Sequence, residues 1–186
     1  MQTATERYDQ TTIALHWAVA VLVAFQWLGA HAIDWFPKGP LRVDARSVHI
    51  LIGVTLVGVL GFRLFWRRVR GERLPPANAG LLGVIARAVH GLLYLLVAGV
   101  LAGGMATELV RGDSLFGLIS LPKIGAMAGP ARHALAEQIG GLHGLGANLI
   151  LFVAGAHAAA ALVHHYVLKD GVLRRMAFAS RSDQAR

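Results

Sequence analysis

Four long apolar stretches constrain this 186-residue chain more than any other feature of its sequence. They cover roughly residues 11–33, 46–66, 81–106 and 138–166. Each is long enough to cross the hydrocarbon core of a bilayer, which takes about 20 mostly apolar residues in a helix. The mean hydropathy of +0.55 is also typical of a membrane protein. We therefore predict an all-α, integral membrane, antiparallel four-helix transmembrane bundle that forms a single domain over residues 1–186.

The formal net charge of +8 is concentrated in two segments that lie at the same end of such a bundle. Residues 63–87 carry five net positive charges, and residues 168–186 carry three. Because basic residues remain on the cytoplasmic side of a membrane, both termini are predicted to be cytoplasmic and the loop at about 107–137 periplasmic. We interpret these arginines as topology determinants that contact lipid headgroups, and we expect no nucleic-acid partner.

Histidines are the side chains best suited to redox or metal chemistry here, because the chain contains no cysteine for iron–sulfur clusters or thiolate metal sites. The nine histidines are His16, His31, His49, His90, His133, His143, His157, His164 and His165. Ionisable side chains inside a bilayer are costly and rare. Each histidine within a predicted span is therefore a candidate functional residue.

The spacing of the histidines predicts two sites at different depths. His143 and His157 are 14 residues apart in one predicted helix, which places them within about 40° of the same face but about 21 Å apart along the axis. They share a face but not a site, so each needs a partner from another helix. Matching depths in an antiparallel bundle pairs His49 with His143 and His16 with His157.

Bis-imidazole ligation of haem iron is the interpretation that we favour for two such pairs, since an apolar bundle can enclose a porphyrin. Small residues such as Gly53, Gly144 and Gly146 would leave room for the macrocycle, although they equally allow close helix packing. Two alternatives stay open. A zinc or copper transporter would want carboxylate or thiolate partners, which the spans nearly lack. A proton relay could coexist with haem.

Several motifs of this sequence resemble the bacterial cytochrome b561 family. They are ALHW at 14–17, SVHILIG at 47–53, HGLLYLL at 90–96, and HAAAALVHHYVLKD at 157–170 followed by LRRM. The resemblance covers roughly residues 7–178. It implies a multi-pass protein of the bacterial inner (cytoplasmic) membrane with two haem b groups. By matching motif positions, it supports His16 and His157 as ligands of the inner haem iron, and His49 and His143 as ligands of the outer one.

The resemblance also implies an activity. The more similar members of this family that are known in functional detail act as superoxide oxidases, which pass electrons from superoxide at the periplasmic face through both haems to ubiquinone. We therefore expect a superoxide:quinone oxidoreductase. The wider superfamily contains electron-relay subunits, so the alternative is an electron-relay cytochrome b that exchanges electrons between the quinone pool and a protein partner. The expected partners are the lipid bilayer, quinone and superoxide, and a homo-oligomer is compatible with the sequence.

Three further residues receive roles within this hypothesis. Arg46, three residues before His49, is expected either to clamp a haem propionate or to guide the anionic superoxide. His164 lies seven residues after His157, within about 20° of the same helix face, and is the first candidate for a proton donor to quinone. His90 is either a second quinone contact, a propionate contact or a competing ligand of the inner haem.

Overall fold

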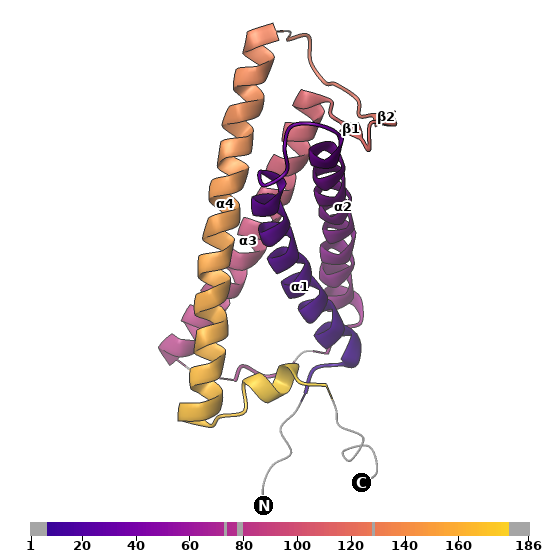
Figure 1. Ribbon diagram of the computed structural model, residues 1–186. Helices are drawn as coiled ribbons and strands as arrows, with labels where there is room; N and C mark the ends of the chain where they lie inside the picture. The colour runs from indigo at the N-terminus through magenta and orange to yellow at the C-terminus, as the bar shows by residue number, and fades with distance from the viewer. Residues whose placement is uncertain (1–6, 73, 78–79, 128, 179–186) are drawn as a thin grey trace, which may run out of the picture.

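Four long α-helices dominate the computed structural model, which describes residues 7–72, 74–77, 80–127 and 129–178. Within these residues the helices are α1 (Gln10–Ile33), α2 (Pro40–Val69), α3 (Gly80–Arg111) and α4 (Gly129–Val163) (Figure 1). A short hairpin, β1 (Ser114–Leu115) with β2 (Ile119–Ser120), follows α3, and α4 leads into a π-helical turn (His164–Leu168) and a 3₁₀ turn (Leu173–Met176). Each long helix is apolar enough to cross a membrane, which confirms the predicted all-α transmembrane bundle.

The two ends of the bundle differ in chemistry. The start of α1 and the end of α4 lie at one end, while the β1–β2 hairpin lies at the other, beside the start of α2 (Figure 1). We call the first the basic end, because the arginine-rich end of α2, with Arg67 and Arg68 in its last turn, lies there. We call the second the hairpin end.

The helices are longer than the apolar stretches that predicted them. Helix α2 begins at Pro40 rather than at residue 46, and α4 begins at Gly129 rather than at residue 138, so much of the expected loop at 107–137 is helical. Hydropathy identifies only the part of a helix that lies in lipid. The backbone stays helical into water until proline or glycine interrupts it, as Gly39 and Pro40 do at the start of α2.

The bundle consists of two helix pairs that make few contacts with each other. Helix α1 packs along α2, and α3 packs along α4. The pairs meet in a small apolar cluster whose buried members are Leu60 of α2, Val97 of α3 and Ile150 of α4. Val23 of α1 packs against the same cluster. This cluster lies near the middle of the spans.

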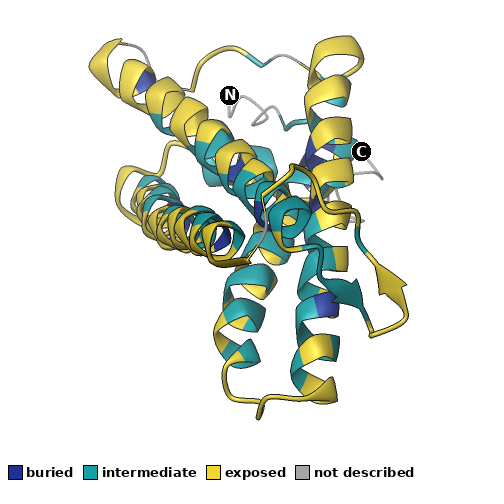
Figure 2. Cartoon of the chain, turned by 90° about the horizontal axis from the view of Figure 1, so that it is seen from above, coloured by how far each residue is buried: buried dark blue, intermediate teal, exposed yellow. Residues whose placement is uncertain are grey.

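Most of the helical surface is apolar and exposed, with buried residues confined to a few inward positions (Figure 2). Phe25, Leu95 and Phe152, for example, are each more than half exposed. Such a surface would be unfavourable in water, but it suits contact with acyl chains. The surface therefore agrees with the membrane location that the four apolar spans predict.

Asp9 joins three segments at the basic end. Its carboxylate caps α1 by accepting hydrogen bonds from the backbone N–H of Thr12 at 2.9 Å and the Thr12 hydroxyl at 2.6 Å. It also accepts from Trp66 Nε1 of α2 at 2.9 Å and from the backbone N–H of Glu72 at 3.2 Å. Although burial alone would raise it, these hydrogen bonds lower the pKa of Asp9 to about 2.

We expect Asp9→Ala to destabilise the basic end. Loss of an N-cap costs about 1 kcal/mol, which corresponds to a decrease of about 2 to 4 °C in the unfolding midpoint of a chain of this size. Because the pKa of Asp9 is depressed in the folded state, its contribution is present above the ordinary value of 3.8 and is lost as the pH falls toward about 2. Thermal unfolding in detergent, followed by circular dichroism, measures both effects.

The matched control is Asp9→Asn, which keeps a good capping side chain. It should retain most of the stability at neutral pH and lose the acid-dependent part. An alanine variant as stable as the wild type at pH 7 would contradict the role of Asp9.

Candidate functional site

The structure brings His49 of α2 and His143 of α4 together near the hairpin end. Their ring centres are 6.2 Å apart, and the ring planes are 80° apart. His143 Nδ1 donates a hydrogen bond to the Val100 carbonyl at 2.8 Å. Because a carbonyl only accepts, Nδ1 carries the proton, and the Nε2 lone pair stays available to a metal. His49 Nδ1 is buried and has no hydrogen-bond partner among the described residues.

A second pair, His16 of α1 and His157 of α4, lies toward the basic end. Their ring centres are 6.4 Å apart with an interplanar angle of 73°. His90 of α3 is a third member, with its ring centre 5.1 Å from that of His157. The two pairs join the same four histidines that depth matching paired from the sequence. Their role as ligands stays a prediction.

The spacing within each pair fits a metal ion held between two imidazoles. An imidazole nitrogen binds a first-row metal at about 2 Å and lies about 1 Å from its own ring centre, so two rings on opposite sides of one ion have centres about 6 Å apart. Among the described residues, no cluster of three or more histidine, aspartate or glutamate side chains could hold a metal ion. Two-histidine sites suit haem, in which the porphyrin supplies the remaining ligands, better than zinc, which wants four ligands from protein or water.

Glycines of α3 and α4 let these two helices approach closely beside His143. A Cβ atom on Gly104 would lie 2.9 Å from His143 Cε1, and one on Gly146 would lie 2.6 Å from Val100 Cγ2. Gly144 has no neighbour within 4 Å of such an atom. Gly146 therefore serves helix packing, one of the two alternatives left open from the sequence. Gly104, in the GG pair at 103–104, was not among the expected residues.

Arg63 is an intramembrane residue that the sequence analysis did not single out. It lies within the apolar part of α2, where its Nη1 is 3.1 Å from His16 Nδ1 and its Nε donates to Tyr94 Oη at 3.1 Å. Arg67 Nη1 donates to the same hydroxyl at 3.3 Å. A cation inside a span points to function. The sequence alone did not predict these contacts, because Arg63 was counted with the topology arginines that follow it.

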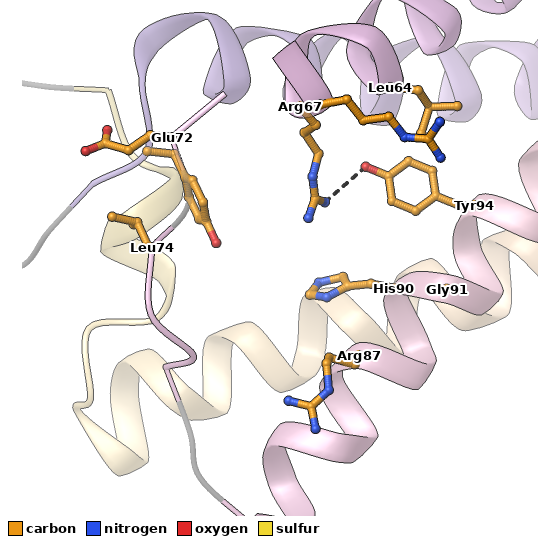
Figure 3. Close-up of a pocket in the computed structure, with 10 residues that line it drawn as sticks. Leu64, Arg67, Glu72, Leu74, Arg87, His90, Gly91 and Tyr94 are labelled. Carbon is orange, nitrogen blue, oxygen red and sulfur yellow. Dashed lines mark hydrogen bonds between the residues drawn. The ribbon is translucent and has the colours of Figure 1, made fainter. Parts of the chain in front are cut away.

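A cavity of about 580 Å³ opens at the basic end between α2 and α3. Arg67, Arg87, His90 and Tyr94 extend toward this space from the two helices (Figure 3). Neither His16 nor His157 lines it. His90 thus lies between the second histidine pair and the cavity, which is consistent with two of the three roles expected for it, a quinone contact or a propionate contact.

Arg46 is tied to the hairpin end by an ion pair. Its Nη1 lies 3.0 Å from Asp113 Oδ2, with the two side chains 37% and 22% exposed. The adjacent Ser47 is fully buried and its hydroxyl accepts a hydrogen bond from the backbone N–H of Phe116 at 2.8 Å. The hairpin is therefore fastened to the start of α2, and the charge of Arg46 is partly balanced.

His164 forms a pair with Asp170 at the end of α4. His164 Nδ1 contacts Asp170 Oδ2, and Asp170 Oδ1 accepts from the backbone N–H of Val172 at 3.1 Å. Burial alone would raise the pKa of Asp170, but the hydrogen bonds from His164 and Val172 lower it. His164 begins the π-helical turn, a distortion frequent at functional sites, and Asp170 follows that turn. His164 does not line the 580 Å³ cavity.

Comparison with known proteins shows what the chain resembles over nearly its whole length. A family model described as prokaryotic cytochrome b561 matches residues 7–179. A probable superoxide oxidase, CybB, from Yersinia pestis is 32% identical over 174 aligned positions, which cover 92% of this chain and 96% of the relative. Cytochrome b561 homolog 2 of Escherichia coli (strain K12) is 31% identical, with coverage of 96% and 95%. Cytochrome b562 of Cereibacter sphaeroides is 29% identical, with coverage of 91% and 94%.

The two pairs predict the outcome of removing single histidines. His49→Ala or His143→Ala should abolish one haem, and His16→Ala or His157→Ala the other, because each iron would lose one of its two protein ligands. His90→Ala is the matched control, since it removes an adjacent imidazole from the same region and should leave both haems bound. Pyridine haemochrome analysis of purified protein measures the haem content. One haem per wild-type chain, or loss of a haem in the His90 variant, would contradict this assignment.

Proposed function

Because the chain belongs to the prokaryotic cytochrome b561 family, a family of membrane electron-transfer cytochromes that bind haem b, we propose that it transfers electrons from superoxide to ubiquinone. In this proposal two superoxide anions each lose one electron and become dioxygen. One quinone gains the two electrons and two protons and becomes quinol. The observation that carries the proposal is the pair of two-histidine sites stacked between opposite ends of the bundle. The name of the Yersinia pestis relative supports the choice of superoxide.

Two haems, when bound, supply one-electron redox chemistry at two depths of the membrane. The protein's own part is to hold them at a fixed separation. His143 and His157 lie on one helix, α4, and are therefore about 21 Å apart along its axis. The apolar cluster of Leu60, Val97 and Ile150 fills the layer between the two levels. In this proposal, electrons would cross the apolar layer between the two haems, while a proton would find no polar partner there.

The hairpin end is the proposed entry point for superoxide, and the basic end the proposed cytoplasmic side. The orientation follows from the arginines near the end of α2 and after α4. Arg46 lies three residues from His49, on the side from which superoxide would approach. It would attract this anion, while its partner Asp113 limits that attraction.

Quinone reduction requires protons, and the His164–Asp170 pair is the proposed route for them. Asp170 is held by the backbone N–H of Val172 and fixes the orientation of the His164 ring. An imidazole oriented by a carboxylate is a common general acid and base near neutral pH. The position of His164 at the end of α4 would let it take protons from the cytoplasm without opening a path across the bilayer.

We expect the reaction with superoxide to depend on the charge at position 46. Arg46→Gln should slow haem reduction by superoxide about twofold at low salt, since a charge at about 8 Å in water contributes about 0.5 kcal/mol. Asp113→Asn should accelerate the reaction by a similar factor, because it removes the balancing negative charge. Stopped-flow haem spectra at several ionic strengths measure the rate, which should fall with added salt in the wild type.

The Arg46→Gln/Asp113→Asn double variant is the control, because it restores the net charge and should restore the rate. The haem midpoint potentials of all three variants need to be measured as well. They separate a change in the attraction of superoxide from a change in the driving force for haem reduction. Rates that depend neither on salt nor on these charges would contradict electrostatic guidance. If superoxide reduces no haem at all, the proposed donor is wrong and an electron relay with a protein partner takes its place.

We expect His164→Ala to slow quinone-dependent reoxidation of the haems about 100-fold, the size of a general-acid contribution. Both haems should stay bound, and haem reduction by superoxide should stay fast. Asp170→Asn should show a smaller decrease in the same step. His90→Ala is the matched comparison at the other candidate position. If the His164 variant reoxidises at the wild-type rate and the His90 variant does not, quinone is reduced at the cavity between α2 and α3 instead.

A further inference from the structure

The cavity at the basic end contains charge that the proposed reaction does not use. Three arginines line it, Arg67 and Arg68 from α2 and Arg87 from α3, against one carboxylate, that of Glu72. The Glu72 carboxylate points away from Arg67 and Arg87 in the close-up view (Figure 3). The cavity therefore presents a net positive charge.

None of these three arginines has a carboxylate partner among the described residues. Arg67 donates a hydrogen bond to Tyr94 Oη. In the part of the chain that the structure describes, Arg68 and Arg87 take part in no ion pair and no side-chain hydrogen bond. Guanidinium groups from two helices that face one cavity repel each other, and an anion between them would offset this repulsion.

The position and lining of the cavity indicate the class of anion. It lies at the end of the spans, where α2 and α3 emerge from the apolar layer, and this is the depth of lipid headgroups. Leu64 and Leu74 add apolar surface to the arginines. Basic pockets between transmembrane helices at this depth suit the headgroups of anionic lipids. A neutral quinone would leave the guanidinium charges unmatched.

We propose that the cavity between α2 and α3 binds the headgroup of an anionic phospholipid, with Arg68 and Arg87 contacting its phosphate from opposite sides. The lipid would join the two helix pairs where they make few direct contacts. Because it binds the folded protein, it raises the unfolding temperature. This inference concerns a site other than the His164–Asp170 pair, which does not line the cavity.

The test uses the purified holoprotein in an uncharged detergent, titrated with phosphatidylglycerol or with phosphatidylcholine. Native mass spectrometry counts bound lipid, and thermal unfolding reports its effect on stability. Phosphatidylglycerol should bind and raise the unfolding midpoint, and phosphatidylcholine should do neither. Arg68→Gln and Arg87→Gln should each weaken phosphatidylglycerol binding about fivefold, and the double variant about 25-fold, since each arginine near a lipid headgroup contributes about 1 kcal/mol. Haem content should not change.

Arg70→Gln is the matched control, because Arg70 caps the same end of α2 but does not line the cavity. It should bind phosphatidylglycerol like the wild type. Equal weakening by all three substitutions would overturn the proposal in favour of diffuse surface attraction. Loss of haem in the double variant would overturn it in favour of haem propionates. Competition by a short-chain ubiquinone would make the cavity a quinone site, and equal binding of free glycerol phosphate would make it a general oxyanion site.

Discussion

The presence of imidazole side chains inside an apolar bundle is the constraint on which the rest of the structure depends. A polar ring that lies in the membrane is costly unless it has a partner. Here each candidate ring has a second ring whose centre is 6.2 or 6.4 Å away, a spacing that fits one metal ion between the two rings. The partners come from different helix pairs, so the pairs cannot close against each other along their whole length. This explains why direct contact between them is sparse and why the shared apolar core is limited to one layer around Leu60, Val97 and Ile150.

The two ends of the bundle differ in charge and in hydrogen bonding. At the hairpin end, the cation nearest the histidine pair, Arg46, is held by Asp113, and the hairpin is fastened to α2 through Ser47. At the basic end, arginines outnumber carboxylates, and titratable side chains are abundant. Under the proposed function, the first end would exchange electrons with a small anion, and the second would supply protons and contact lipid. The apolar cluster of Leu60, Val97 and Ile150 lies between the two ends.

The sequence predicted the four helices and the depth of each histidine, because hydropathy and helical periodicity depend only on local composition. The predicted helix bounds are wrong where a helix extends beyond the hydrocarbon layer, because hydropathy identifies only the part in lipid. Helix α4 begins at Gly129, outside the apolar stretch, because its first turns lie beyond the hydrocarbon layer. Arg63 was interpreted as one of several topology arginines, yet it turns inward to Tyr94 and His16. A charge count by segment does not distinguish an inward arginine from its outward neighbours.

By itself the sequence determined that this is a four-span membrane protein and that four histidines lie at two depths. These properties follow from residue type and spacing along single helices. Only the tertiary structure decided which groups meet: the ring distances within each pair, the contact of Asp170 with His164 in the chain reversal after α4, and the cavity beside His90. The physical reason is that these contacts depend on how two helix pairs and a chain reversal are placed relative to one another, and no local pattern encodes that placement.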